Sequence, residues 1–303
     1  MKIALQIIIF LIIVGFIYEQ VSRLNIEEKF PPIGKKVNID GHSLHYVKKG
    51  LGVGSVIFEA GLDPSGTLSW SKVQDEVAPY TSTLSYDRAG LSWSERGQNP
   101  KTADSIATEL HTLLEKTNMP KPYILVGHSF GCLTLRSFVK KYPEEVAGIV
   151  FVDGSHPKQN EKYEQKSFTI PRWLVGLANN IGLVRLFSSQ NTYPNTSKAD
   201  AINIKMQGMI FKGIDTIVEE MNSFDTVAKE VEAIDSFEDI PLTVISAVSD
   251  DDKIWVDLQK DLLNLSTNAK HVMTQESGHY IQLEKPELVV EEIKKILLRG
   301  GKQ

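Results

Sequence analysis

A serine stands between two glycines near the middle of the chain. The stretch "YILVGHSFGCLTL" covers residues 123–135 and places Ser129 between Gly127 and Gly131. Four strand-forming residues precede the first glycine and a helix-like stretch follows the serine, which predicts a sharp strand-to-helix turn. Glycines two positions before and after the serine remove side chains that would collide in such a turn. A serine hydroxyl raised at that corner is a candidate nucleophile for attack on a carbonyl group.

Three stretches carry a resemblance to a known family. They are "FEAG" at 58–61, "YDRAGLSWS" at 86–94 and "LVGHSFG" at 125–131. With them the chain resembles the lidded serine hydrolase and esterase branch of the α/β-hydrolase fold family, over roughly residues 37–300. The resemblance implies an α/β fold, with a mostly parallel central sheet, helices on both faces and an inserted helical cap. It also implies a triad in the chain order serine, acid, histidine.

One residue departs from the family pattern. Cys132 follows the second glycine of the turn, where such proteins commonly carry glycine or alanine. A thiol is small enough to pack at this position, so we expect the chemistry to be unchanged. Cys132 is not expected to be the nucleophile.

The base implied by this chain order is His279. A serine hydroxyl is a weak nucleophile at neutral pH and needs a base within hydrogen-bond reach. His279 follows the last predicted strand and precedes a terminal helix. The other candidates fit less well, because His128 lies inside the turn, His271 begins a strand and His156 follows a different strand. We therefore expect His279 to take the proton of Ser129.

The acid of the triad has several candidates. Asp250 ends the strand predicted in "PLTVISAVSDDDK", and the family's acid usually sits on the loop that leaves this strand. Asp251 and Asp252 follow directly, so a small shift of register would bring either of them into place. Asp153 in "FVDGSH" ends the preceding strand, where some α/β hydrolases take their acid. Asp250 is the first choice, and the other three stay open.

Two backbone N–H groups are expected to bind the developing oxyanion. The first belongs to Phe130, which would begin the helix after the turn. The second belongs to Leu62 in "EAGLDPSG", because Gly61 lets this loop approach the serine closely. A carboxylate there would oppose negative charge, so we expect Glu59 to point away, towards Arg88.

Strands and helices alternate along most of the chain, which predicts a mostly parallel sheet covered on both faces. A hairpin with its turn at Asp40-Gly41 opens the pattern. The other predicted strands are 55–58, the first part of 82–90 (a strand followed by a turn), 123–126, 147–154, the one that begins near 241, and 270–274. The predicted helices are 70–79, 102–117, 130–142, 253–265 and 286–298.

The alternation stops between residues 156 and 238. This segment shows helical patterns at 171–188, 199–213 and 214–233. The prediction is a core of residues 37–155 and 239–303 with a helical cap of residues 156–238 inserted in it. The apolar side chains of 171–188 favour an apolar acyl or leaving group, although packing against the sheet explains them equally well.

The first residues predict a membrane segment. Residues 3–18 are apolar except for Gln6, after a single Lys2. At ~1.5 Å per residue they span roughly 24–27 Å, slightly less than a ~30 Å hydrocarbon core. We expect residues 1–20 to be a membrane anchor, with a cleaved signal peptide as the alternative, and residues 21–36 to be a polar tether. Lys2 favours an amino end inside the cell and a catalytic domain outside the cytoplasm, or a secreted one if the segment is cleaved.

Composition narrows the choice of function. The 303 residues carry a net charge of -5 without a Lys/Arg-rich run, so a nucleic-acid partner is not expected. The single cysteine rules out an intramolecular disulfide. The scattered histidines match no metal-site spacing, and the chain has no P-loop or dinucleotide glycine pattern, so no metal or cofactor is expected.

These features predict a serine hydrolase that cleaves a small-molecule acyl substrate, an ester of a lipid or of a small alcohol, through an acyl-enzyme. One alternative is an aminopeptidase of the proline-iminopeptidase kind, in which cap acids such as Glu219 or Glu220 would hold a free amine. A second is a catalytically silent hydrolase fold that serves as a binding module.

Overall fold

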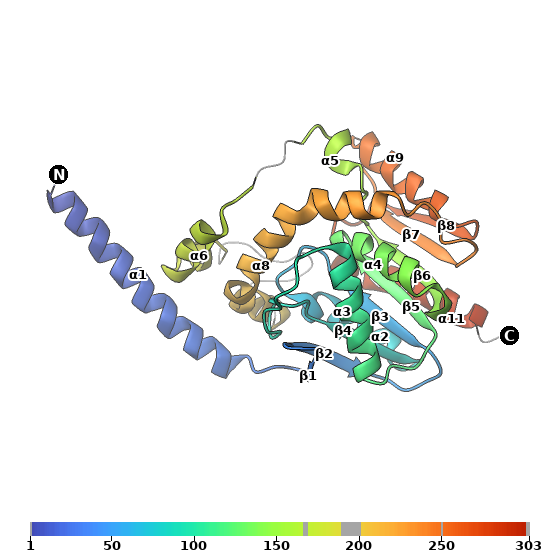
Figure 1. Ribbon diagram of the computed structural model, residues 1–303, viewed down its shortest axis with the longest axis horizontal. Coiled ribbons are helices and arrows are strands. Elements are labelled where there is room, and N and C mark those ends of the chain that lie inside the picture. The colour runs from blue at the N-terminus through green and yellow to red at the C-terminus, as the bar shows by residue number, and fades with distance from the viewer. Residues whose placement is uncertain (1, 166–168, 189–200, 250, 301–303) are drawn as a thin grey trace.

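The computed structural model describes residues 2–165, 169–188, 201–249 and 251–300 (Figure 1). Its centre is an eight-stranded sheet in the order β1-β2-β4-β3-β5-β6-β7-β8. The pairs β1–β2 and β2–β4 are antiparallel, and all other neighbours are parallel. The strands are β1 Lys35–Asn38, β2 Ser43–Lys49, β3 Ser55–Glu59, β4 Ser82–Tyr86, β5 Tyr123–His128, β6 Val146–Val152, β7 Leu242–Ala247 and β8 Ala269–Thr274. The predicted mostly parallel sheet is confirmed.

The central strands are buried on both faces. Every residue of β3, β4 and β5 is buried, as expected of parallel strands that helices cover on either side. Helices α3 (Ala103–Lys116) and α4 (Phe130–Lys141) pack into the larger apolar cluster on one face. Helices α2 (Ser71–Val77) and α11 (Pro286–Gly300) pack into the second cluster on the other face. The sheet is thereby a rigid base for the loops at its carboxyl edge.

Most predicted helices are present, with small changes at their ends. Thr102 caps α3 by accepting a hydrogen bond from the backbone N–H of Ser105. The helix predicted at 70–79 is a 3-10 turn followed by α2, and the one predicted at 253–265 is α9 followed by a 3-10 turn. These 3-10 turns are η1 (Gly66–Trp70) and η3 (Leu262–Leu265), and α9 covers Lys253–Asp261. Two further short elements are η2 (Pro143–Glu145) and α10 (Ile281–Glu284).

The segment between β6 and β7 contributes helices α5 (Gln159–Lys162), α6 (Arg172–Asn180), α7 (Leu183–Ser188) and α8 (Ala201–Glu232). The single helix predicted at 171–188 is wrong, because Gly182 adopts a φ of 78° and separates α6 from α7. The two helices predicted at 199–213 and 214–233 form one continuous α8. Gly213 stays inside this helix, where a Cβ would come within 3.0 Å of Pro64.

The chain begins with a long helix, α1 (Lys2–Lys29). The expected tether at 21–36 is therefore helical as far as Lys29. Among the described residues, one segment of this helix, Lys2–Leu24, is long and apolar enough to cross a membrane, and a signal sequence would pass the same test. Figure 1 shows α1 projecting away from the sheet, with its amino end far from the rest of the molecule.

Candidate active site

Ser129 occupies a strained turn between β5 and α4. Its backbone has φ 49° and ψ −122°, which is unfavourable for any residue other than glycine. Neighbouring backbone groups hold this conformation in place. The N–H of Ser129 donates to the carbonyl of Val152 at 3.2 Å, and its own carbonyl accepts from the N–H groups of Cys132 and Ser155, each at 3.0 Å. The sharp corner that the sequence predicts is therefore present, with the serine at its tip.

Steric crowding explains why glycines surround Ser129. A Cβ on Gly131 would lie 2.6 Å from the carbonyl oxygen of Ala60, and a Cβ on Gly127 would lie 2.8 Å from a side chain of α4. In the facing loop, a Cβ on Gly61 would lie 3.0 Å from the Cβ of Ser129. A side chain at Gly131 would clash with the loop after β3 and one at Gly61 would crowd Ser129, so these two glycines allow the loop to touch the turn, while Gly127 makes room for α4.

His279 is hydrogen-bonded to Asp153. The ring Nδ1–H of His279 donates to Oδ2 of Asp153 at 2.6 Å. The other carboxylate oxygen accepts from the backbone N–H of Ala247 at 3.0 Å and from the indole N–H of Trp255 at 2.9 Å. Asp153 is buried and follows β6 directly, with a φ of 44° that turns it out of the strand direction. This bond fixes the ring so that Nε2 is left as the basic nitrogen.

The remaining candidate acids are placed differently. Asp250, the first choice from the sequence, lies outside the described residues. Asp251 is exposed to solvent. Asp252 caps α9 by accepting from the N–H of Trp255 at 3.0 Å, and both of its oxygens accept from the hydroxyl of Tyr163 at 2.7 Å. Among the described candidates, Asp153 is the one that is hydrogen-bonded to His279.

An open hollow of about 460 Å³ lies above this turn. Its wall includes Ser129, Asp153 and His279, and on the cap side it includes Gln159 and Tyr163 next to α5. Burial, and secondly Asp252, raise the pKa of Tyr163, so its hydroxyl stays protonated. The volume of the hollow lies within the usual range for small-molecule binding sites. The serine, the histidine and the buried carboxylate therefore face one shared space.

The backbone groups expected at the oxyanion position lie beside the turn. Phe130 is the first residue of α4, and the first N–H groups of a helix have no acceptor within the helix. Leu62 follows Gly61 in the loop that touches Ser129. Both residues expected as donors thus belong to segments that meet at the serine.

A buried arginine supports the loop that carries Leu62. Arg88 donates from one terminal nitrogen to the carbonyl of Ala60 at 2.5 Å and from the other to the carbonyl of Gly61 at 2.6 Å. It also donates to Glu59 at 2.6 Å, as the sequence predicts. Burial raises the pKa of Glu59, and Arg88 offsets part of that effect. The carboxylate of Glu59 therefore points away from the hollow and towards the guanidinium.

The cap supplies a second partner for this arginine. Glu220, on α8, accepts from Arg88 through both of its carboxylate oxygens, at 2.9 and 2.7 Å. The two side chains are buried. Sequence reasoning missed this contact, because nothing local in the sequence joins residues 132 positions apart. Through it, the long cap helix is tied to the loop beside the serine.

His128 lies under the site and stays neutral. Its Nε2–H donates to the backbone carbonyl of His279 at 2.9 Å, and the two rings lie 4.6 Å apart. Burial, and secondly the neighbouring His279, lower the pKa of His128 to about 3. Its role is to hold the segment that carries His279, in agreement with its exclusion as the base.

The thiol of Cys132 is also unsuited to chemistry. The residue is buried, and burial raises the pKa of the thiol well above its ordinary value. A Cβ on Gly154 would lie 2.9 Å from its Sγ, which shows how tightly it is packed. The expectation that Cys132 packs at this position is confirmed.

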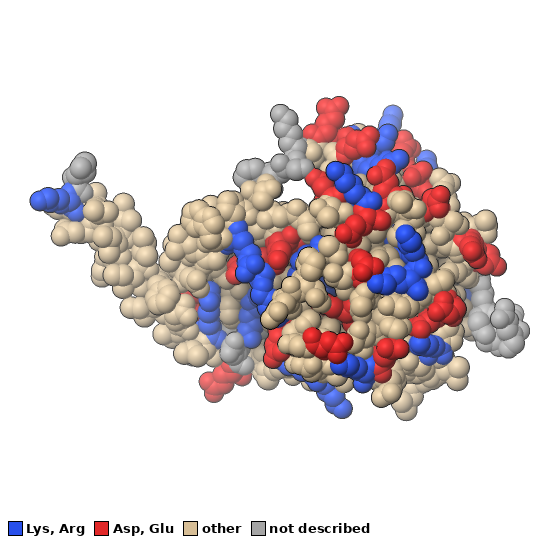
Figure 2. All heavy atoms as spheres, viewed as in Figure 1, with Lys and Arg blue, Asp and Glu red and all other residues tan. Residues whose placement is uncertain are grey.

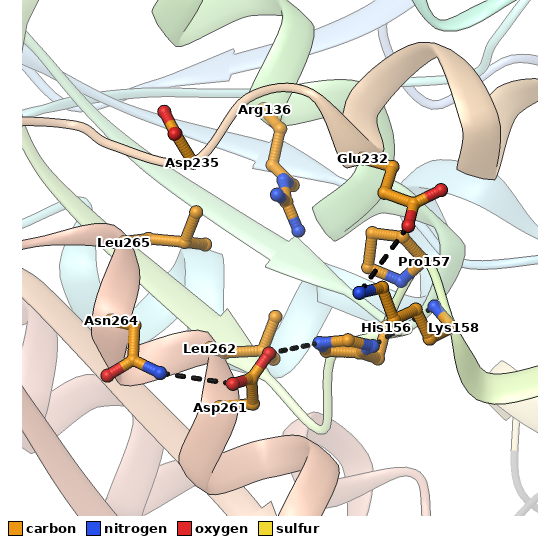
Figure 3. A pocket seen from close by; sticks show the side chains of 10 residues that line it. All are labelled: Arg136, His156, Pro157, Lys158, Glu232, Asp235, Asp261, Leu262, Asn264 and Leu265. Carbon is orange, nitrogen blue, oxygen red and sulfur yellow. Dashed lines mark hydrogen bonds and ion pairs between the residues drawn. The ribbon is translucent and has the colours of Figure 1, made fainter. Parts of the chain in front are cut away.

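His156 belongs to a second, smaller pocket of about 140 Å³ (Figure 3). Figure 3 shows its ring pointing towards Asp261, to which Nε2–H donates at 2.9 Å. Its Nδ1 accepts the backbone N–H of Lys158 at 3.1 Å. Because both ring nitrogens have partners, His156 has no free basic nitrogen to offer.

Sequence reasoning missed four further side chains of the larger hollow. Ser155 places its hydroxyl 3.5 Å from that of Ser129, and it stands two residues after Asp153 at the same strand end, which was the available signal. No motif marks Trp255 of α9, Gln159 of α5 or Tyr163, which follows α5.

Comparison with known proteins agrees with this architecture. The family model described as alpha/beta hydrolase fold matches residues 56–286. An AB hydrolase superfamily protein of Gibberella zeae is 24% identical over 266 residues, covering 75% of this chain and 81% of that protein. An esterase structure from Thermogutta terrifontis superposes with a TM-score of 0.67 at 18% identity, covering 88% of this chain and 99% of the other. The epoxide hydrolase CorEH gives a TM-score of 0.67 at 19% identity, covering 88% and 98%. Since the family model spans more than half of the sequence, the chain belongs to the alpha/beta hydrolase fold family.

Proposed function

We propose that the protein is a serine hydrolase that cleaves carboxylic esters by acyl transfer. Ser129 is the nucleophile, His279 the general base and Asp153 the residue that orients the base. The observation that carries the proposal is the hydrogen bond between His279 and the buried Asp153, in the same hollow as the strained serine. A serine hydroxyl, which is a weak nucleophile by itself, becomes reactive when a base is held where it can accept the hydroxyl proton.

The reaction begins with attack on the ester carbonyl. Oγ of Ser129 bonds to the carbonyl carbon while its proton passes to Nε2 of His279. The N–H groups of Phe130 and Leu62 stabilise the negative oxygen of the tetrahedral intermediate. When this intermediate collapses, the protonated His279 gives its proton to the leaving alcohol, and an acyl group remains on Ser129.

Water then completes the cycle. His279 removes a proton from a water molecule, which attacks the acyl carbonyl, and the same proton returns to Oγ of Ser129 as the carboxylic acid leaves. Oγ of Ser129 lies near Ser155. Triad hydrogen bonds often tighten only in the substrate complex, so the serine is expected to turn towards His279 when an ester binds.

The identity of the nucleophile favours esters over epoxides. Attack of a serine oxygen on an epoxide carbon would leave an ether on the enzyme, and water does not readily cleave an ether. Attack on an ester leaves an acyl group that water removes in the second step. The epoxide hydrolases among the structural neighbours therefore support the fold of this chain and not its substrate.

The aminopeptidase alternative is less well supported. It needs a cap carboxylate that is free to bind a substrate amine. Glu220 is buried and paired with Arg88 through both oxygens, and Glu219 forms an ion pair with Arg96. Neither of the acids considered for that role is directed at the hollow.

The proposal is tested by pre-steady-state hydrolysis of p-nitrophenyl esters of increasing chain length. The wild type should release one equivalent of p-nitrophenol per active site in a burst, because acylation precedes the slower release of acid. Ser129→Ala should lose the burst and the turnover. Ser155→Ala is the matched control, since its hydroxyl lies in the same hollow, and it should keep the burst. A wild type without turnover on any ester would favour the silent binding module.

A further inference from the structure

The N-terminal helix is built into the cap by buried charges. Glu19 on α1 is buried, and its carboxylate accepts from Arg23 at 2.8 Å and from Arg185 of α7 at 2.7 and 3.0 Å. The ring of Phe211 on α8 lies 5.2 Å from the guanidinium carbon of Arg23 and 5.1 Å from that of Arg185. Helix α1 is thus an integral part of the folded molecule at this level.

The backbones meet one turn earlier. A Cβ on Gly15 would lie 2.5 Å from the carbonyl oxygen of Ile181, in the turn between α6 and α7. At the other end of the contact, Arg23 donates to the carbonyl of Asn179 and to the side chain of Asn180, each at 3.1 Å. The contact zone of α1 with the cap therefore runs from Gly15 to Arg23.

The length of α1 places this contact zone at membrane depth. Residues 2–14 precede this contact zone, in the part of α1 that projects from the molecule (Figure 1), and at ~1.5 Å per residue they cover about 20 Å. A hydrocarbon core is ~30 Å thick and needs about 20 helical residues. A bilayer crossed by α1 must therefore extend about 10 Å further along the helix, past Gly15, where α6 and α7 lie.

The surface of the cap at this level is apolar. We define the cap patch as the exposed large apolar side chains of α6 and α7, of which Trp173 is 71% and Phe187 70% exposed. The other members are Leu174, Leu177, Leu183 and Leu186. Figure 2 shows uncharged surface along most of the projecting helix and on the lobe beside it, while charged side chains gather over the rest of the molecule.

The one buried residue of helix α6 is polar, while its large apolar side chains are exposed. Asn179 is buried and donates to the carbonyl of Phe211 at 2.8 Å, whereas Trp173 and Leu177 face outwards. A helix that packs on a water-soluble domain shows the opposite arrangement. Apolar patches of this kind mark surfaces for a membrane or a protein partner, and Trp is enriched at the membrane interface.

We propose that the cap patch inserts into the leaflet from which the catalytic domain emerges, so that its partner is the lipid bilayer itself. The exposed side chains of the α1 span and of the cap patch are apolar, and the charges of the contact zone that joins the two are paired with one another, with Glu19 buried. This inference rests on the function proposed above where the substrate is concerned: for an ester hydrolase held on a bilayer in this way, an ester drawn from the bilayer is the substrate class that fits.

The test is fluorescence quenching in phosphatidylcholine vesicles whose acyl chains are brominated near the headgroup. The full chain has four tryptophans, of which Trp70 and Trp93 are buried in the core. Brominated lipid should quench the wild type, and Trp173→Phe should remove most of that quenching. Trp255→Phe is the matched control, because Trp255 lines the hollow, and it should be quenched as the wild type is.

Two results would overturn the proposal: an unquenched wild type, or equal quenching of the wild type and Trp173→Phe. If Trp173 stays unquenched while two chains cross-link through the cap, a second copy covers the patch instead. Quenching needs no turnover, so Ser129→Ala should behave as the wild type does. The quenching test therefore remains valid even if the protein proves not to be an ester hydrolase.

A second readout concerns the substrate class. The double variant Trp173→Ser/Phe187→Ser should hydrolyse a long-chain ester held in vesicles about tenfold more slowly, since burial of such side chains favours insertion. Hydrolysis of a water-soluble short-chain ester should change less than about twofold, because neither residue lines the hollow. An equal loss on both esters would contradict supply of the substrate from the bilayer.

Discussion

At the scale of single residues, the carboxylate of Asp153 is engaged on both oxygens. His279 takes one of them, and Trp255 and Ala247 donate to the other. A carboxylate held in this way cannot rotate, so it fixes the direction of the histidine ring. Asp252 is also engaged on both oxygens, by α9 and Tyr163, so what distinguishes Asp153 is its hydrogen bond to His279.

Replacing the orienting carboxylate should slow the chemistry and leave binding almost unchanged. Asp153→Asn is expected to lower kcat for a short-chain ester by about 10⁴, because an amide favours the wrong ring tautomer of His279. Asp252→Asn and Asp250→Asn should each keep more than about a tenth of the wild-type kcat. Steady-state kinetics checks this, and a large loss confined to Asp250→Asn would show that the acid is assigned wrongly.

His128 should make the fold sensitive to acid. Its pKa is lowered to about 3 by burial, below the ~6.5 of the unfolded chain, so the unfolded state binds this proton first as the pH falls. Its contribution to the free energy of unfolding is complete above about pH 6.5 and declines towards pH 3, by about 2 kcal/mol at pH 5. Urea unfolding in detergent at pH 7.5 and pH 5 should show a smaller pH dependence for His128→Gln. An unchanged dependence would contradict this assignment.

Sequence reasoning selected Ser129 and His279 as candidates because each has a local signal, a turn motif and a position after the last strand. It could not choose the acid. Asp153 and Asp250 follow two neighbouring parallel strands, β6 and β7, and both ends reach the same edge of the sheet. What brings Asp153 to the histidine is its positive φ together with the indole of Trp255, 102 positions away.

At the scale of elements, Arg88 connects the cap to the loop beside the serine. It binds the carbonyls of Ala60 and Gly61 on one side and Glu220 of α8 on the other. A movement of α8 would therefore displace the segment that carries Leu62. The sequence predicted the contact with Glu59, which lies in the neighbouring strand, but not the one with the cap.

Loss of this cap contact should destabilise the fold. Glu220→Gln removes one charge from a buried pair and is expected to cost about 3 kcal/mol in the free energy of unfolding. Glu219→Gln is the matched control on the same helix, because its pair with Arg96 is solvent-exposed and should contribute less than about 1 kcal/mol. Denaturant unfolding of both variants in detergent measures the difference. Equal losses would mean that the buried pair is no stronger than the surface pair.

Two helix boundaries differ from those that the local hydrophobic spacing of the sequence predicted. Gly182 ends a helix that hydrophobic spacing predicted to continue, while Gly213 sits inside one that it predicted to end. The first glycine adopts a left-handed φ, and the second lies against Pro64, a contact that cannot be seen in the sequence. The helical continuation of α1 through the expected tether likewise coincides with contacts of Arg23 to Asn179 and Asn180 of α6, 156 and 157 positions away.

At the scale of the whole molecule, the sheet and its helices follow from periodicity, but the position of α1 does not. Alternating strand and helix patterns were sufficient for the parallel core, since each element buries its own apolar face. The attachment of α1 depends on Glu19, Arg185 and Phe211, which come from three separate helices. This attachment favours an anchor that stays with the protein over a signal that is removed.

The anchor is tested by fractionation of cells that express the full chain. The protein should stay in the membrane fraction after carbonate extraction, with an intact mass that includes α1, because the cap and α1 share buried charges. Protease accessibility of a carboxyl-terminal tag in intact cells then reports the side of the membrane, with the domain expected outside the cytoplasm. Soluble protein of reduced mass would instead identify a cleaved signal.

Whether Ser129 is an activated nucleophile can be measured by covalent labelling. A fluorophosphonate probe should label the wild type at one site, and peptide mapping should place the adduct on Ser129. Ser129→Ala, shown to be folded by circular dichroism, should not be labelled, while Ser155→Ala should be labelled as the wild type is. An unlabelled wild type, or equal labelling of Ser129→Ala, would contradict the account.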